Sequence, residues 1–185
     1  LMPVTINGDG SITGLSVGGL GAGVVNTSTI ADGAVTNIKH GAGSVVQVKH
    51  AQTKSNTVSG SSSYTNFGAL DVSITPISSS NLLVYQYNMI VRVRENSSHG
   101  AFAWIAVSDD GGSSYLAENY HRNHDYGGSG CDLDCGACGY AIKTAGSTSA
   151  RTYKVYLKLA DGDSYEVNPA SNQNNSAVTV MEIAV

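Results

Sequence analysis

The chain has 185 residues, of which 41% are hydrophobic, enough for one domain with a core plus an appendage. Charged residues make up only 13%, about half the roughly 25% typical of globular proteins, while Ser, Thr, Asn and Gly are abundant. The net charge is −4 and no Lys/Arg run exceeds two residues, so the sequence lacks the basic stripe that nucleic-acid binding needs. This composition favours many short strands joined by tight turns, as in extracellular β scaffolds.

Residues 1–43 are rich in Gly, Ala, Thr and Val, and they contain one short pattern twice. Residues 9–15 and 32–38 each begin with Asp-Gly, continue with β-branched residues, and follow a Thr-Ile pair. The Asp-Gly predicts a turn, because Gly accepts positive φ without steric cost, and the residues after it predict a short strand. Two copies are too few for a self-standing solenoid, so other copies of the chain are the simplest partners for their apolar faces.

We therefore predict that residues 1–43 form a β-repeat stalk or docking arm. The arms of a homotrimer are expected to intertwine around a shared axis. The alternative is a flexible glycine-rich arm, but the regular alternation of Ile, Val and Leu favours the stalk.

Residues 44–185 have the pattern of a compact all-β domain. Strands are predicted over residues 45–50, 67–76, 81–94, 101–107, 150–159, 165–167 and 178–185. The alternation within 81–94 changes phase midway, which predicts a bulge or a strand buried on both faces. No stretch keeps a 3.6-residue apolar period over ten residues, so little helix is expected. Seven or eight strands in about 140 residues indicate a β-sandwich, jelly-roll-like knob.

Two polar segments of this domain predict turns. Residues 108–115, Ser-Asp-Asp-Gly-Gly-Ser-Ser-Tyr, resemble the aspartate box of sialidase-type β-propellers, which is a structural hairpin. Propellers repeat the box several times and this chain has it once, so we interpret it as a surface hairpin turn. Residues 161–164, Asp-Gly-Asp-Ser, predict another turn, and their two carboxylates are too few for a Ca²⁺-binding loop.

The sequence carries no sign of membrane insertion or of export. No apolar run approaches the ~18 residues needed to cross a bilayer. The first residues have neither the basic segment nor the apolar segment of a secretory signal peptide. A virion protein reconciles this with the extracellular style of composition, because it assembles in the host cytoplasm and is released by lysis. We therefore predict a location on the virion, where residues 1–43 are expected to dock onto other virion proteins.

Several short segments carry a resemblance that spans nearly the whole chain. They are TINGDGSITGL at 5–15, GSVVQV at 43–48, VSITP at 72–76, TVMEI at 179–183, and residues 17–20 and 82–84. These segments resemble short tail-fibre or head-fibre structural proteins of marine and cyanobacterial tailed bacteriophages. The resemblance implies a trimeric β-rich knob, similar to tumour-necrosis-factor-like jelly rolls, and a virion location. It brings no catalytic residue, and it is silent about the cysteine-rich segment.

That segment holds all three cysteines of the chain, Cys131, Cys135 and Cys138, shortly after His121 and His124. Thiolates and imidazoles are ligands that Zn²⁺ prefers, and Cys135-Gly-Ala-Cys138 has the spacing of a zinc knuckle. Only one such knuckle is present, whereas zinc modules usually pair two. Three interpretations stay open: a zinc site made from these five residues, a local disulfide with one spare thiol, and three free thiols. Zinc is the single cofactor that the sequence brings into consideration.

Tyrosines are concentrated between residues 108 and 140. Tyr115, Tyr120, Tyr126 and Tyr140, with Asn123, are candidate binding residues, because tyrosine offers a large contact area at low entropic cost and stacks on sugar rings. The segment interrupts the series of predicted strands, and long irregular excursions are often functional. We expect it to be a loop that forms the distal binding face for a host-surface glycan or receptor. The alternative is a loop that merely packs on its own domain.

Three functions follow as hypotheses. The first is a non-enzymatic short trimeric tail fibre, whose knob attaches the particle to its host. The second is a capsid decoration protein, acting as cement or head fibre, which the brevity of the segment before the domain favours. The third, a small glycan-active enzyme, is disfavoured because no H-E-x-x-H or P-loop motif occurs and the chain is too short for a β-helical depolymerase body.

Overall fold

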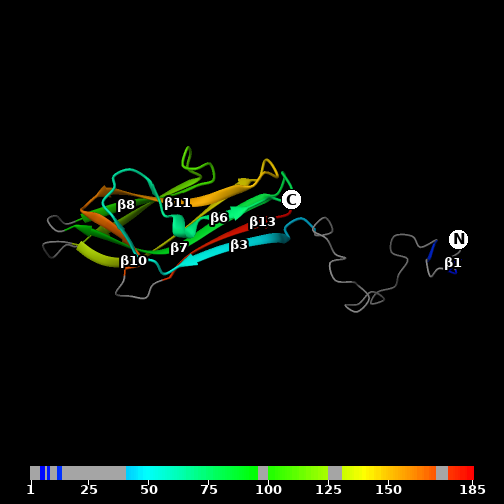
Figure 1. Ribbon diagram of the computed structural model, residues 1–185, viewed down its shortest axis with the longest axis horizontal. Coiled ribbons are helices and arrows are strands. Elements are labelled where there is room, and N and C mark those ends of the chain that lie inside the picture. Colours follow the sequence, from blue (N-terminus) through cyan, green and yellow to red (C-terminus); the bar gives the residue numbers. More distant parts are fainter. Residues whose placement is uncertain are drawn as a thin grey trace. The chain divides into compact units, whose positions relative to one another are not determined.

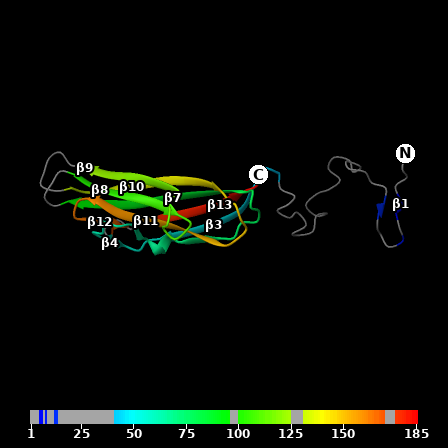
Figure 2. The same ribbon diagram turned by 90° about the horizontal axis from the view of Figure 1, so that it is seen from above.

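A computed structural model describes residues 5–6, 8, 12–13, 41–95, 100–124, 131–169 and 175–185. The chain divides into two compact units, Leu1–His40 and Gly41–Val185, and each is described by itself. The strands of the second unit form two stacked layers (Figure 1; Figure 2). Within the described ranges, no helix has the length and apolar character needed to cross a membrane.

The described residues of the first unit form a small antiparallel pair. β1 (Thr5–Ile6) and β2 (Ile12–Thr13) lie side by side, with Ile6 opposite Ile12. The strand expected after the first Asp-Gly is therefore present at β2. The second copy of the pattern, at 32–38, lies outside the described residues, and the intertwined trimeric stalk stays a prediction.

One sheet of the second unit is built around β7. Its six strands are β3 (Val45–Thr53), β4 (Thr57–Ser59), β7 (Leu82–Glu95), β10 (Cys131–Thr144), β12 (Ser164–Val167) and β13 (Ser176–Ile183). β7 pairs with β10 along all 14 residues of both strands. On its other side β7 pairs first with β13 and then with β12, and these two strands pair in turn with β3 and β4. All these pairings are antiparallel.

The second sheet repeats this plan around β11. Its five strands are β5 (Thr65–Asn66), β6 (Val72–Ile74), β8 (Gly100–Ser108), β9 (Ala117–His124) and β11 (Arg151–Asp161). β11 pairs with β8 on one side and with the short β5 and β6 on the other, and β9 pairs with β8. The predicted all-β sandwich is confirmed, with two antiparallel sheets in a jelly-roll-like arrangement.

The core lies between the two sheets and follows from strict alternation along the long strands. In β7 every second residue from Leu83 to Glu95 is buried, and in β11 the predicted core face of Tyr153, Val155, Leu157 and Leu159 is buried as expected. Burying one such apolar side chain contributes about 1.5–3 kcal/mol, so this shared interior is the main stabilising term.

Asn168 stabilises the point along β7 at which its partner strand changes from β13 to β12. Its backbone has a positive φ of 50°, which Asn tolerates better than most residues. The backbone N–H of Asn168 donates to the carbonyl oxygen of Ile90, and the Ser176 hydroxyl donates to the Asn168 side-chain oxygen at 2.7 Å. The Ile90 N–H donates to the same Ser176 hydroxyl at 3.3 Å, so both backbone groups of Ile90 keep partners although no strand pairs with them on this side.

Three sequence expectations are corrected. β7 keeps its alternation and its register with β10 without a bulge. The apparent change of phase in the sequence comes from Ile90, an apolar residue on the outward side of the strand, where it is half-buried. Residues 67–76 do not form one strand: a 3₁₀ helix at Gly68–Leu70 interrupts them before β6. Residues 108–140 are not an irregular loop, because β9 and most of β10 lie there as regular strands. The described domain consequently has more strands than the seven or eight expected.

The C-terminal strand carries a buried carboxylate, Glu182, with an exposed fraction of 0%. Its Oε1 accepts hydrogen bonds from Asn81 Nδ2 at 2.7 Å and from the backbone N–H groups of Ile77 and Ser78 at 2.8 and 3.2 Å. Its Oε2 accepts from Gln47 Nε2 at 2.8 Å. Burial alone would raise the pKa of Glu182, but these donors outweigh burial and lower that pKa below 4.5. The carboxylate thereby fastens β13 to β3 and to the segment that precedes β7.

We predict that Glu182→Gln lowers the free energy of unfolding at pH 7 by about 3 kcal/mol, because an amide cannot accept from all four donors. The folded-state pKa lies below the ordinary value of 4.5, so this stabilisation is present above that pH and is lost as pH falls through the folded pKa. Urea unfolding at pH 7 and at pH 3 should show the gap between wild type and variant shrinking at pH 3. Glu118→Gln, at an exposed site, is the control, and an equal gap at both pH values would contradict the assignment.

Candidate binding faces

The outer face of the β8 sheet carries a group of aromatic rings. Along β8, Ala101 and Ala103 are fully buried, and the residues between and after them, Phe102 and Trp104, point outward. Tyr120 on β9 lies beside both rings. Its ring centroid is 5.4 Å from that of Phe102 at an interplanar angle of 15°, and 4.9 Å from that of Trp104 at 58°. Tyr120 is half exposed, so this aromatic surface is open to solvent.

Two basic side chains lie against these rings. Arg122, opposite Phe102 in register, places Cζ 5.2 Å from the Phe102 ring centroid. Lys158 on β11, opposite Trp104, places Nζ 5.7 Å from the Trp104 ring centroid and 4.2 Å from that of Tyr64. Such cation–π contacts contribute about 0.5–1 kcal/mol each at exposed sites. They also place positive charge beside rings that face solvent.

A second group of rings continues the same surface. The ring centroids of Tyr64 and Tyr115 are 4.4 Å apart, and those of Tyr115 and Tyr156 are 5.7 Å apart with nearly perpendicular planes. The Tyr64 hydroxyl donates to Glu118 Oε1 at 2.6 Å, and burial together with that carboxylate raises the pKa of Tyr64. Because Lys158 contacts both groups, they form one surface. We call it the aromatic face, made of Phe102, Trp104, Tyr120, Tyr64, Tyr115 and Tyr156.

The turn between β8 and β9 is held by Asp110. The buried Ser108 hydroxyl donates to Asp110 Oδ1 at 2.6 Å and accepts from the backbone N–H of Gly112 at 2.9 Å. Ser114 donates its backbone N–H and its hydroxyl to the same carboxylate. The hydrogen bonds from Ser108 and then Ser114 lower the pKa of Asp110 far below its usual range. The predicted surface hairpin turn at 108–115 is confirmed.

This turn packs onto the aromatic face. Gly112 has a φ of 92°, which favours glycine, and a Cβ built on it would lie 3.0 Å from Tyr156 Cζ. The close approach of the turn to Tyr156 places Tyr115 among the rings. The segment that resembles an aspartate box therefore positions a candidate binding residue.

The predicted binding residues divide between two sheets. Tyr115 and Tyr120 both lie on the aromatic face, so the structure brings these two together. Tyr140 lies on β10, on the outer face of the opposite sheet, where it is 68% exposed. Asn123 is on β9 but its side chain lies outside the described residues, and so does the whole of Tyr126.

The predicted zinc ligands fall on two strands. β10 keeps an unbroken register with β7 through Cys131, Cys135 and Cys138, so its backbone has no knuckle turn there. The Cys138 thiol is free and exposed, and burial lowers the pKa of His121 on β9. The side chains of His124, Cys131 and Cys135 lie outside the described residues. Among the side chains that are described, no group of three His, Cys, Asp or Glu is placed to hold a metal, and zinc stays a prediction.

The sequence reasoning missed the residues that complete the aromatic face. Phe102 and Trp104 were taken only as part of a strand, and Tyr64 and Lys158 were not singled out. A signal was available in residues 101–104, where Ala alternates with large aromatic residues. Small residues inward and rings outward reverse the usual pattern of a half-buried strand, and this reversal indicates an outer face with a role of its own.

The outer face of the β7 sheet holds an open groove of about 770 Å³. Neutral side chains of four strands line it: Gln86, Tyr87, Asn88, Asn119, Cys138, Tyr140, Ala177 and Thr179, with Gly139. Two of the lining residues bond to each other: the Tyr87 hydroxyl, on the inward side of β7, accepts a hydrogen bond from Asn119 Nδ2 at 2.6 Å, which links β7 to β9 of the other sheet. A Cβ on Gly139 would lie 2.5 Å from Tyr87 Cζ, so only glycine at this position of β10 lets the link form.

Comparison with known proteins gives distant structural similarity alone. No protein-family model and no curated protein sequence matches the chain. The structure of Eiger TNF from S. frugiperda aligns with a TM-score of 0.41 and 11% identity over 74% of this chain and 92% of that one. The VP2 protein of infectious bursal disease virus aligns with a TM-score of 0.35 and 11% identity over 77% and 38%.

A third solved structure is a xylan-binding domain from Paenibacillus barcinonensis, with a TM-score of 0.28 and 10% identity over 78% of this chain and 97% of that one. Because all three TM-scores lie below 0.5, the proposals below rest on the residues of this chain and not on these structures.

We predict that Gly139→Ala lowers the free energy of unfolding by about 1–3 kcal/mol, since its methyl group would push against the buried Tyr87 ring. Gly136→Ala on the same strand is the matched control, because a Cβ there meets nothing within 4 Å. Thermal or urea unfolding of both variants measures the difference. Equal stability of the two variants would show that the close approach of Tyr87 to Gly139 does not exist in solution.

Proposed function

We propose that this chain is a non-enzymatic attachment protein of a bacteriophage particle, a short trimeric fibre whose domain binds a host-surface glycan. The virion location, the homotrimer and the docking of the N-terminal arm onto other virion proteins come from the sequence analysis. The glycan-binding role is supported by one observation, the aromatic face.

The chemistry of the aromatic face suits a saccharide. The apolar faces of sugar rings stack on aromatic side chains, and Trp104 with the half-exposed Tyr120 offers such a platform. Sugar hydroxyl and carboxylate groups need polar partners, which Arg122, Lys158 and Glu118 supply at the margin. The cross-strand register fixes these groups on regular strands, so the platform is formed before ligand arrives.

An ordinary structural role for the rings is weaker. Cross-strand aromatic pairs stabilise a sheet by roughly 0.2–1 kcal/mol each, and one such pair needs no further explanation. Here five rings that are at least partly exposed and two cations share one surface with the buried Tyr156 ring. Beside Phe102 and Trp104, the core side of β8 holds only Ala101 and Ala103, before Ile105 and Val107 continue it. A fold that needed apolar mass alone would place the larger side chains inward.

Trp104 is the only tryptophan of the chain, so its fluorescence reports directly on the aromatic face. We predict that titration with oligosaccharides of neutral hexoses or of uronic acids changes Trp104 emission for at least one class. Tyr120→Ala should weaken that binding at least about tenfold, or about 1.4 kcal/mol, because it removes one side of the platform.

Tyr140→Ala is the matched control, since Tyr140 is a more exposed tyrosine on the opposite sheet. It should leave the affinity measured by fluorescence unchanged. If no saccharide class alters Trp104 emission, and adsorption of particles to host cells survives Tyr120→Ala, glycan attachment is wrong. Capsid decoration by a cement or head-fibre protein then becomes the better account.

A further inference from the structure

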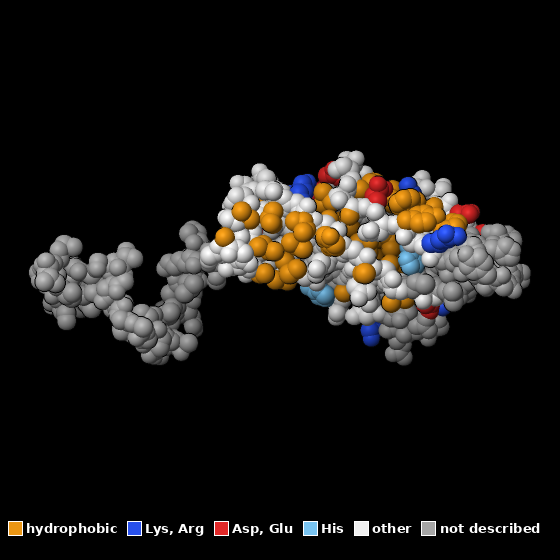
Figure 3. All heavy atoms as spheres, turned by 180° about the vertical axis from the view of Figure 1, so that it is seen from behind, with side chains coloured by type: hydrophobic (Ala, Val, Ile, Leu, Met, Phe, Trp, Pro, Cys, Tyr) orange, Lys and Arg blue, Asp and Glu red, His pale blue; other side chains and the backbone are white. Residues whose placement is uncertain are grey.

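The outer face of the β7 sheet has a chemistry unlike that of the aromatic face. The register places side chains in cross-strand rows over β3, β13, β7 and β10. One row is wholly apolar and consists of Val48, Met181, Val84 and Ile142. Val48 and Ile142 are 55% and 57% exposed. Figure 3 shows hydrophobic side chains gathered in patches on the surface of the domain.

The row next to it is polar and contains no Asp, Glu, Lys or Arg; it consists of Tyr140, Gln86, Thr179 and His50. His50 Nδ1 and the Thr179 hydroxyl lie 3.0 Å apart, within hydrogen-bond distance. The rows on either side of these two likewise contain no Asp, Glu, Lys or Arg. We call these four rows, over Leu82–Asn88 of β7 and the residues opposite on its neighbours, the neutral face.

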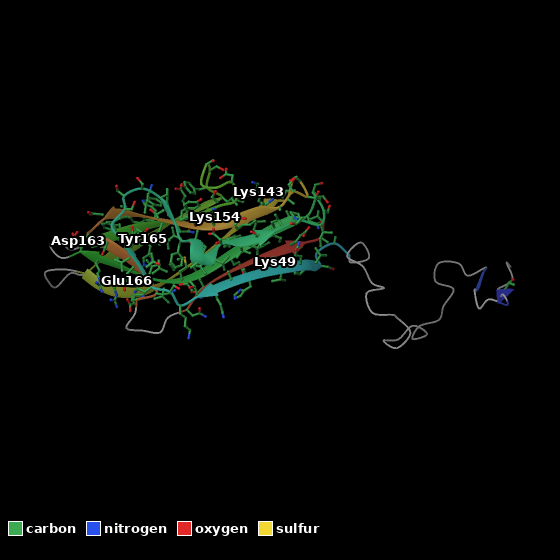
Figure 4. All side chains as sticks on the ribbon, viewed as in Figure 1. Lys49, Lys143, Lys154, Asp163, Tyr165 and Glu166 are labelled. Carbon is green, nitrogen blue, oxygen red and sulfur yellow. The ribbon has the colours of Figure 1, made fainter. Side chains whose placement is uncertain are left out.

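On the outer face of this sheet, the charged residues with printed ion pairs lie along the other half of β7. Arg92 contacts the carboxylates of Asp134 and Glu166 at 2.5 and 3.6 Å, and Arg94 contacts Glu166 at 3.3 Å. Glu166 lies on β12 (Figure 4). On the outward-facing rows the separation is sharp, with charge confined to the β12 half. Lys49, Lys143 and Glu182 belong to rows that alternate with the neutral ones, opposite the inward-facing Leu83 and Val180.

We infer that the neutral face is where copies of this chain pack against one another. A rotation axis brings residues close to it against their own copies, so a charged residue there would meet a like charge. A surface without formal charge avoids that repulsion, whereas a partner of opposite charge would find nothing to pair with. The charge pattern therefore selects a second copy of the chain as the occupant.

The size of the neutral face fits this role. Seven residues of β7 span about 24 Å, and four strands span about 19 Å, which gives roughly 450 Å² of flat area on each copy. Two copies would bury about 900 Å² before the relief of side chains is added, close to the roughly 1,000 Å² expected of a specific interface. The groove around Tyr140 gives the partner's side chains a recess to enter.

This inference rests on one part of the proposed function, the association of several copies of the chain, and not on glycan binding or on the virion location. It differs from the sequence-based expectation by placing a contact in the folded domain, whereas the intertwined arms were predicted to hold the trimer. It concerns the opposite sheet from the aromatic face, so glycan binding and assembly can fail separately.

The test is sedimentation velocity of the full chain at micromolar concentration, with circular dichroism to check the fold. Wild type is expected at a multiple of 19.1 kDa. Ile142→Glu and Val48→Glu should shift it to 19.1 kDa, because each introduces repelling carboxylates at the contact. Val58→Glu on β4 is the matched control, because Val58 is 56% exposed on the same sheet outside the neutral face.

A measurement on the unaltered face covers the case in which a variant fails to fold. The Cys138 thiol is exposed in the single chain, and copies on the neutral face would cover it. Maleimide labelling followed by peptide mass spectrometry should be at least about fivefold slower at Cys138 than at the cysteine introduced by Val58→Cys. A monomeric wild type, a multimer that survives both charged variants, or equal labelling of the two cysteines would overturn the inference. The single-site saccharide affinity of Ile142→Glu should stay that of wild type, which separates this result from the glycan proposal.

Discussion

β7 pairs with the long β10 on one edge and with the shorter β13 and β12 on the other, and this pairing decides where both outer faces lie. Its register with β10 runs without a shift from Leu82–Thr144 to Glu95–Cys131. A one-residue slip would move its buried side chains to solvent, so the alternation of β7 and the pairing with β10 support each other. The change of partner strand leaves the backbone of Ile90 without a strand beside it, and Asn168 and Ser176 supply the missing hydrogen-bond partners.

Buried polar groups secure the neighbours of β7. Glu182 brings four donors together where β13, β3 and the segment before β7 meet. The Tyr87–Asn119 hydrogen bond reaches from β7 to the other sheet, past a position that must be glycine. A buried polar group that keeps its partners adds little net stability, whereas one that loses them destabilises the fold. These sites therefore specify the arrangement of the strands more than they add to total stability.

The two outer faces of the sandwich differ in chemistry because their inner faces are filled differently. The first half of β8 uses Ala101 and Ala103 inward and presents Phe102 and Trp104 outward. β7 uses Tyr85, Tyr87 and Met89 inward, which leaves residues such as Val84 and Gln86 outside. The first face offers rings with cations at the margin, suited to saccharides. The second offers an uncharged surface, suited to another copy of the chain. The proposed attachment fibre would use both, one for the host and one for assembly.

The sequence alone determined the all-β class, most of the strands and the hairpin turn, because period-two alternation and Asp-Gly turns are local signals. It did not find β9 and the first part of β10, whose polar and glycine-rich residues, as in Ala117–His124, lack that alternation. Those strands form because β8 and β7 supply backbone partners, which is a tertiary effect. Because these strands were not recognised, the sequence analysis grouped Tyr115, Tyr120 and Tyr140 into one candidate site on the basis of composition alone. Only the pairing of β9 and β10 with different sheets decided that they lie on separate faces.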